Sequence, residues 1–126
     1  MSQGVHDNDG GDEKSILVFI VIPSHAEDET LLPDKVKDKW IREAQTIFAK
    51  LFTGSTAFDA RAGSYWSETK SKILWDKPVI VESWARVEIA TDLQTLASIH
   101  KLALGIKAKM NQECVMVGID SVIHFI

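Results

Sequence analysis

Residues 51–66 read LFTGSTAFDARAGSYW, and within this stretch the pattern of apolar residues changes from helical to strand-like. Before it, apolar residues recur at three- and four-residue spacing over 36–52, which places them on one face of a helix. Gly54 is expected to end that helix, because glycine takes the left-handed conformation readily. Residues 55–61 then alternate and predict a strand, with Phe58 as its anchor in the core. The stretch therefore marks a crossing from a helix into a strand.

The other elements lie on either side of this crossing. Residues 15–22 (SILVFIVI) are apolar on both faces, which is typical of a central strand. Residues 79–88 alternate after a proline and predict a second long strand. A second helix is expected to start at Thr91, where TDLQ has the pattern of a capping box. Two short strands, 113–119 and 122–126, are predicted to end the chain.

The resulting order, β-α-β-β-α-β plus a closing strand, predicts an α+β fold of the ferredoxin-like split βαβ type. In this sandwich both helices cover one face of an antiparallel sheet and the other face is open. Residues 67–77 either form a long hairpin loop or extend the strands on both sides. We expect residues 15–126 to form one domain. Residues 1–14 are acidic and almost free of apolar residues, which predicts a disordered tail.

Composition excludes several classes of protein. A chain of 126 residues with 45% hydrophobic residues is long enough to bury a core without a metal or a disulfide, and its single cysteine permits no internal disulfide. The net charge of −4 argues against nucleic-acid binding, which usually needs a basic surface. The longest apolar run, 16–22, is far too short to cross a membrane. We therefore expect a cytoplasmic bacterial protein without a membrane or nucleic-acid partner.

The first candidate binding site lies at the end of the opening stretch. Arg61 is followed closely by the aromatic pair Tyr65 and Trp66. A planar guanidinium binds a carboxylate or phosphate through two hydrogen bonds, and aromatic rings beside it offer a stacking surface. The alternative interpretation is structural: Arg61 pairs with Glu68 and pins a hairpin, while the tryptophan closes the edge of the core.

The open face of the sheet is the second candidate site. Glu82, Trp84 and Arg86 alternate along the strand at 79–88 and are expected to point away from the helices. An exposed tryptophan on an open sheet indicates contact with a ligand or a partner, and a homodimer is the simplest such partner. His124 on the last strand would approach these residues if it points to the same face.

Other reactive side chains match no recognisable motif. His25 lies beside Glu27 and Asp28, but no second histidine stands at metal-ligand spacing, so an acidic loop is expected rather than a metal site. Cys114 stands among apolar residues and is expected in the core, where a thiol is not activated. A phosphate loop, a dinucleotide fingerprint and zinc-ligand spacing are all absent from the sequence. We therefore predict no metal and no cofactor, and assign no catalytic residue.

Several segments together resemble a loose group of small bacterial ferredoxin-like proteins that have no established activity. The segments that carry the resemblance are Gly54–Phe58, Ala60–Trp66, Pro78–Glu82 and Asn111–Glu113. The chain departs from the pattern by an additional residue, Ala62, between Arg61 and Gly63. The resemblance covers about residues 15–126. It implies a fold and the location of a site, but no reaction.

Two hypotheses about function follow. The first is a non-catalytic interaction or assembly module that forms a homodimer and binds a protein partner, because no acid–base pair is evident and Trp84 is expected on an open face. The alternative is a small enzyme or a protein that binds an anionic ligand. Its pocket would use Arg61, Tyr65, Trp66, Glu82, Arg86 and His124. A cavity of a few hundred Å³ would favour the alternative.

Overall fold

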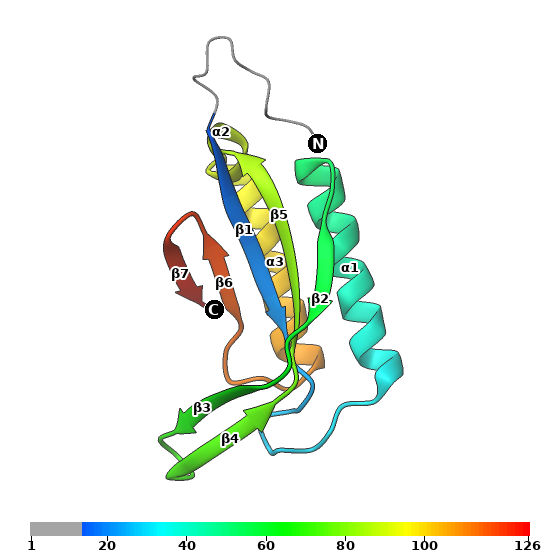
Figure 1. The fold of residues 1–126 in the computed structure, drawn as a ribbon, viewed down its shortest axis with the longest axis vertical. Helices are drawn as coiled ribbons and strands as arrows, with labels where there is room; N and C mark the ends of the chain where they lie inside the picture. The colour runs from blue at the N-terminus through cyan, green and yellow to red at the C-terminus, as the bar shows by residue number, and fades with distance from the viewer. Residues whose placement is uncertain (1–13) are drawn as a thin grey trace.

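A computed structural model describes residues 14–126 of the chain (Figure 1). The predicted tail, residues 1–14, lies outside the described residues except for Lys14. The elements in chain order are β1 (Ser15–Ile22), α1 (Asp34–Phe52), β2 (Thr56–Asp59), β3 (Gly63–Ser67), β4 (Lys72–Asp76), β5 (Val79–Arg86), α2 (Val87–Ala90), α3 (Leu93–Lys109), β6 (Met116–Ile119) and β7 (Val122–Phe125). No helix among the described residues is long and apolar enough to cross a membrane.

The predicted ferredoxin-like α+β fold is confirmed. Five strands form a sheet in the order β2-β5-β1-β6-β7, and every neighbouring pair is antiparallel. Strands β2, β5, β1 and β6 make up the split βαβ arrangement, and β7 adds one strand at the edge beside β6. Strands β3 and β4 pair only with each other, and Figure 1 shows this hairpin extending away from the foot of the sheet.

The core lies between the sheet and the two long helices. On β5, the alternate residues Val79, Val81, Ser83 and Ala85 are buried beneath the helices, whereas Ile80, Glu82, Trp84 and Arg86 are more exposed. Phe48 and Phe52 of α1 meet edge to face within this core, with ring centroids 5.5 Å apart. The expectation that Phe58 anchors the core is wrong, because its side chain is 43% exposed on the edge strand β2.

Both long helices differ from prediction at one end. Helix α1 is followed by Thr53, which takes the left-handed conformation (φ 76°) and donates its N–H to the carbonyl of Ala49, so Gly54 is not the residue that ends it. Helix α3 is capped by Asp92, whose carboxylate accepts the N–H of Gln94. Thr91 instead donates its hydroxyl to the carbonyl of Val87 in the short helix α2.

Residues 67–77 extend the strands on both sides rather than forming a long hairpin loop, which was the other possibility. Tyr65 lies opposite Leu74 and Ser67 lies opposite Lys72, so these pairs share one face of the β3–β4 hairpin. Leu74 and Ser67 are buried, which shows that this inner face packs against the rest of the molecule. The hairpin thus presents one face to the rest of the molecule and the other to solvent.

Candidate functional site

A pocket of about 310 Å³ lies between the β3–β4 hairpin, the end of β1 and the loop that follows α3. Its walls are mostly apolar, and polar groups reach it from only a few side chains. The residues that line it include Val21, Tyr65, Asp76, Gln112, Glu113 and Phe125. These come from five separate stretches of the chain, so the pocket is a product of the fold rather than of any local motif. We call it the hairpin pocket.

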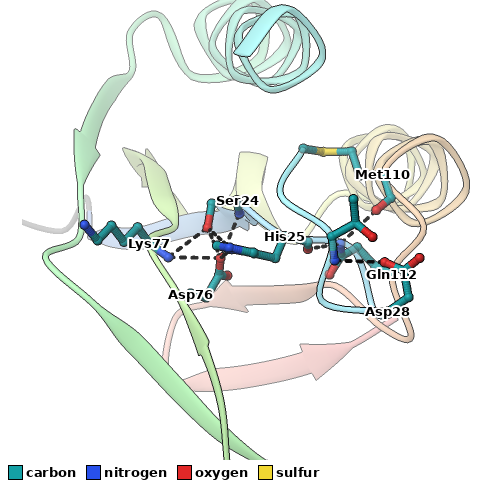
Figure 2. Close-up of polar contacts among 8 residues, drawn as sticks. Ser24, His25, Asp28, Asp76, Lys77, Met110 and Gln112 are labelled. Atoms are coloured by element: carbon teal, nitrogen blue, oxygen red, sulfur yellow. Dashed lines mark hydrogen bonds and ion pairs between the residues drawn. The ribbon is translucent and has the colours of Figure 1, made fainter. Parts of the chain in front are cut away.

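One wall is built by the loop that follows α3, which is hydrogen-bonded to the loop after β1. After this helix, Asn111 takes the left-handed conformation (φ 53°), and its carbonyl accepts the N–H of Glu27 at 2.8 Å. The Gln112 amide donates to the carbonyl of His25 at 2.7 Å and to that of Met110 at 2.9 Å (Figure 2). These bonds fasten the loop after β1 to the end of α3 and fix the position of Gln112 in the pocket.

The opposite wall is held by a partly buried hydrogen-bond network around Asp76 at the end of β4 (Figure 2). Ser24, which is 2% exposed, donates both its N–H (2.8 Å) and its hydroxyl to Oδ1 of Asp76. The N–H of Lys77 reaches the same Oδ1 at 3.0 Å and Oγ of Ser24 at 2.9 Å. His25 Nδ1 lies 2.7 Å from Oγ of Ser24 and 3.5 Å from Oδ1 of Asp76.

The two oxygens of the Asp76 carboxylate have different surroundings. Every side-chain hydrogen bond that Asp76 accepts from the described residues goes to Oδ1. Asp76 also lines the hairpin pocket, and its side chain is 22% exposed. The hydrogen bonds that Asp76 accepts from the described residues are therefore concentrated on Oδ1, and none of them involves Oδ2.

The charge around the hairpin pocket is negative. Burial raises the pKa of Tyr65 above its usual 10.0, and the nearby negative charges of Glu113, Asp76 and Glu27 raise that pKa further. The phenol is consequently protonated at neutral pH and can donate a hydrogen bond. A pocket that combines an aromatic ring, apolar walls and two carboxylates suits a ligand with a flat apolar part and a positive charge.

A second pocket, also of about 310 Å³, adjoins the first and shares Glu113 with it. We call it the polar pocket, because Glu27, Asp28, Lys70 and Asn111 contribute to its walls. Lys70 donates its ammonium group to the Glu27 carbonyl at 2.7 Å and lies 3.3 Å from Glu29.

Two carboxyl groups of the 24–31 loop have lowered pKa values. The pKa of Glu29 is below its usual 4.5 mainly because Lys72, 3.0 Å away, stabilises the charged form. The pKa of Asp28 is lowered by its hydrogen bonds with Thr30. Both groups therefore keep their negative charge at neutral pH, and the polar pocket offers groups of both signs.

Of the residues predicted around the opening stretch, the structure places only Tyr65 in the hairpin pocket. Arg61 lies in the exposed turn between β2 and β3. In the described part of the chain it makes no ion pair with Glu68, so the predicted structural pair is not formed either. Trp66 lies on the outer face of the hairpin, is 55% exposed and points away from Tyr65.

The residues predicted on the open sheet face form no common site with His124. Glu82, Trp84 and Arg86 do share the face of β5 that the helices leave open. His124, however, lies opposite Val117, which lies opposite Ile20 on the helix-covered face. In addition, β1 and β6 separate β7 from β5, so His124 does not approach Glu82.

The residues that sequence reasoning missed are those that the fold brings together. Ser24 and Asp76 are 52 positions apart, and each simply follows or ends a strand. Polar residues at strand ends are a weak signal, and neither residue was predicted to belong to a site. Cys114 was expected in the core, but it is exposed and lines the hairpin pocket.

Two solved structures are similar to this chain over nearly its whole length. One is a phage SAM lyase in complex with S-methyl-5'-thioadenosine, with 16% sequence identity and a TM-score of 0.62, covering 99% of this chain and 95% of that chain. The other is a phage SAM lyase in the apo state, with 12% identity and a TM-score of 0.59, covering 98% and 95%. At these identities the similarity establishes a shared fold. No protein-family model matches the sequence, and no curated protein matches it significantly.

These findings correct the first hypothesis about function. A non-catalytic interaction module was expected, with its contact surface on a flat open sheet. Instead, the fold is shared with an enzyme, and the chain has a pocket of a few hundred Å³ that is lined by two carboxylates. The alternative, a small enzyme or ligand-binding protein, therefore agrees better with the findings. The pocket differs from the predicted one, since its charge favours a cation rather than an anion.

Proposed function

We propose that this protein is a small lyase that binds S-adenosylmethionine in the hairpin pocket and releases a neutral nucleoside thioether such as S-methyl-5'-thioadenosine. The observation that carries the proposal is the combination, in one mostly apolar pocket, of Tyr65 with the carboxylates of Asp76 and Glu113. An adenine ring requires apolar and aromatic contacts, and a sulfonium centre requires a nearby negative charge. The shared fold with the SAM lyase supports the same reading.

In the proposed reaction, the carboxylates of the pocket attract the positively charged substrate. Cleavage of a carbon–sulfur bond of the sulfonium transfers both bonding electrons to sulfur, so a cation becomes a neutral thioether. The carbon fragment is then captured by its own carboxylate, which closes a lactone, or it loses a neighbouring proton to a carboxylate of the pocket; either step balances the charge. Asp76 is attracted to the charged substrate and not to the neutral product. Binding therefore favours the substrate, and the product leaves readily once its charge is gone.

The polar pocket provides a place for the amino-acid end of the same substrate. That end carries a carboxylate and an ammonium group. Lys70 can meet the carboxylate, while Glu27 and Asp28 can meet the ammonium. Because Glu113 lines both pockets, one elongated ligand can span them. We place the nucleoside in the hairpin pocket and the charged end in the polar pocket.

The test is direct. The purified chain is incubated with S-adenosylmethionine, and liquid chromatography with mass spectrometry follows the thioether released. We expect time-dependent formation of S-methyl-5'-thioadenosine, which Asp76→Asn reduces at least about tenfold, because it removes a charge that the substrate needs. Glu82→Gln is the matched control, since Glu82 lies outside the pocket and should leave the rate unchanged. If the chain neither forms the thioether nor binds it at millimolar concentration, the proposal is wrong.

We further propose a homo-oligomer located in the cytoplasm. The oligomer is supported by large exposed apolar side chains on two surfaces: Trp84 on the open sheet face, and Trp66, Ile73 and Trp75 on the outer face of the hairpin. A cytoplasmic location agrees with an intracellular substrate.

A further inference from the structure

Ser24 is a buried serine whose hydroxyl takes part in several hydrogen bonds beside the hairpin pocket. It lies just after β1, is almost completely buried and does not itself line the hairpin pocket. Its hydroxyl nevertheless lies within hydrogen-bonding distance of three groups: Oδ1 of Asp76, Nδ1 of His25 and the N–H of Lys77 (Figure 2).

Counting protons fixes the direction of each bond. A hydroxyl has one proton to donate, and an ionised carboxylate can only accept. The proton of Ser24 Oγ therefore goes to Asp76 Oδ1. The bond between Ser24 and His25 then requires a proton on Nδ1 of His25, and the backbone N–H of Lys77 supplies a further donor to Oγ. Two donors thus polarise the hydroxyl, and the hydroxyl in turn donates to the carboxylate.

We propose that Ser24 is a positioning residue that holds Asp76 by Oδ1, so that Oδ2 is presented to the cationic centre of the ligand. This inference rests on the proposed function. Ser24 supplies two of the donors on Oδ1, its N–H and its hydroxyl, and the Lys77 N–H supplies a third. Without the hydroxyl, the carboxylate loses a charge-assisted hydrogen bond and is held less firmly, by the two backbone N–H groups that remain. The selectivity for a charged ligand over a neutral one should then fall.

The test compares two ligands of similar shape and different charge. Sinefungin carries an amine cation in place of the sulfonium and does not react, whereas S-methyl-5'-thioadenosine is neutral. Calorimetry at pH 7.5 measures both dissociation constants for the wild type, Ser24→Ala and Ser24→Thr. We expect Ser24→Ala to weaken sinefungin binding about tenfold or more and thioether binding less than threefold. Ser24→Thr, which keeps the hydroxyl, should restore the wild-type preference.

Ser83→Ala controls for a general effect of removing a buried hydroxyl. Ser83 is also almost fully buried and donates its hydroxyl to the carbonyl of Gly54, far from the pocket in sequence and outside its lining. This variant should leave both affinities unchanged. If Ser24→Ala does not fold by circular dichroism, Ser24→Cys takes its place, because a thiol fills the space but donates weakly.

The outcomes separate the two proposals. If the wild type binds neither ligand, the proposed function fails and this inference with it. If the wild type prefers sinefungin and Asp76→Asn removes that preference while Ser24→Ala and Ser24→Cys keep it, only the role of Ser24 is wrong. An equal loss of affinity for both ligands in Ser24→Ala also contradicts positioning, because a structural defect would act on both alike.

Discussion

At the scale of the single residue, Tyr65 offers a direct probe of the hairpin pocket because it is the only tyrosine in the chain. Its pKa is raised above 10.0, first by burial and then by Glu113. We therefore expect the tyrosinate absorbance at 295 nm to appear with a midpoint above pH 10. In Glu113→Gln the midpoint should move down but stay above 10, since burial is the larger cause.

The same pKa fixes the sign of a pH effect on stability. A tyrosine whose pKa is higher in the folded state than in the unfolded state contributes stability that is fully present below pH 10 and is lost as the pH rises through the folded pKa. Urea unfolding between pH 8 and 11.5 should therefore show falling stability above pH 10, and less so in Tyr65→Phe. A midpoint at or below 10 in the wild type would contradict the described surroundings of Tyr65.

Single residues also show how far the site could be predicted from the sequence. Tyr65 was found because an aromatic pair after a glycine is a local signal. Ser24 and Asp76 were not found, because their contact joins positions 52 apart and depends on how the hairpin folds back. The face of His124 could not be decided from the sequence, since alternation assigns opposite faces but only the register with β6 identifies which is open.

At the scale of the element, the packing of β6 on β1 depends on Gly118. The ring of Phe19, opposite Gly118 in the register, covers the space where a side chain would stand. A Cβ atom at position 118 would lie 2.0 Å from that ring, so something must move. We expect Gly118→Ala to destabilise the fold by about 1–3 kcal/mol, the usual cost of overpacking.

Gly54→Ala is the control for this experiment. A Cβ at position 54 meets nothing within 4 Å, so this variant should unfold within about 0.5 kcal/mol of the wild type. Urea denaturation measures both variants. Equal stability of Gly118→Ala and the wild type would mean that Phe19 moves aside at no cost, contrary to the expectation.

The elements themselves were largely predictable, whereas their ends were not. The spacing of apolar residues identified α1, and the alternation at 79–88 identified β5. Both patterns arise because an element that buries one face carries apolar residues at a regular spacing. Helix ends depend on competition between adjacent residues. Thr53 takes the left-handed conformation although Gly54 is next to it, and Asp92 caps α3 although Thr91 precedes it. Which residue caps a helix depends on contacts with other parts of the fold, and the local sequence does not show those contacts.

At the scale of the whole molecule, the two faces of the hairpin have different surroundings. Its inner face carries Tyr65 and Leu74 and closes the pocket. Its outer face carries Trp66, Ile73 and Trp75, which are 50–66% exposed and are neighbours across the β3–β4 pairing. Large apolar side chains grouped in this way favour contact with another protein surface. If that surface belongs to a second copy, oligomer formation would also hold the wall of the pocket in place.

This arrangement predicts which substitution disrupts the proposed oligomer. Trp75→Glu places a charge in the outer face, and burying an unpaired charge is unfavourable, so the mass in solution should fall to the 14.0 kDa of one chain. Trp84→Glu makes the same change on the open sheet face, where the tryptophan is equally exposed but stands apart from that cluster. Light scattering measures both variants, and only Trp75→Glu should dissociate the assembly. Dissociation by Trp84→Glu alone would assign the interface to the open face, and a monomeric wild type would contradict self-association altogether.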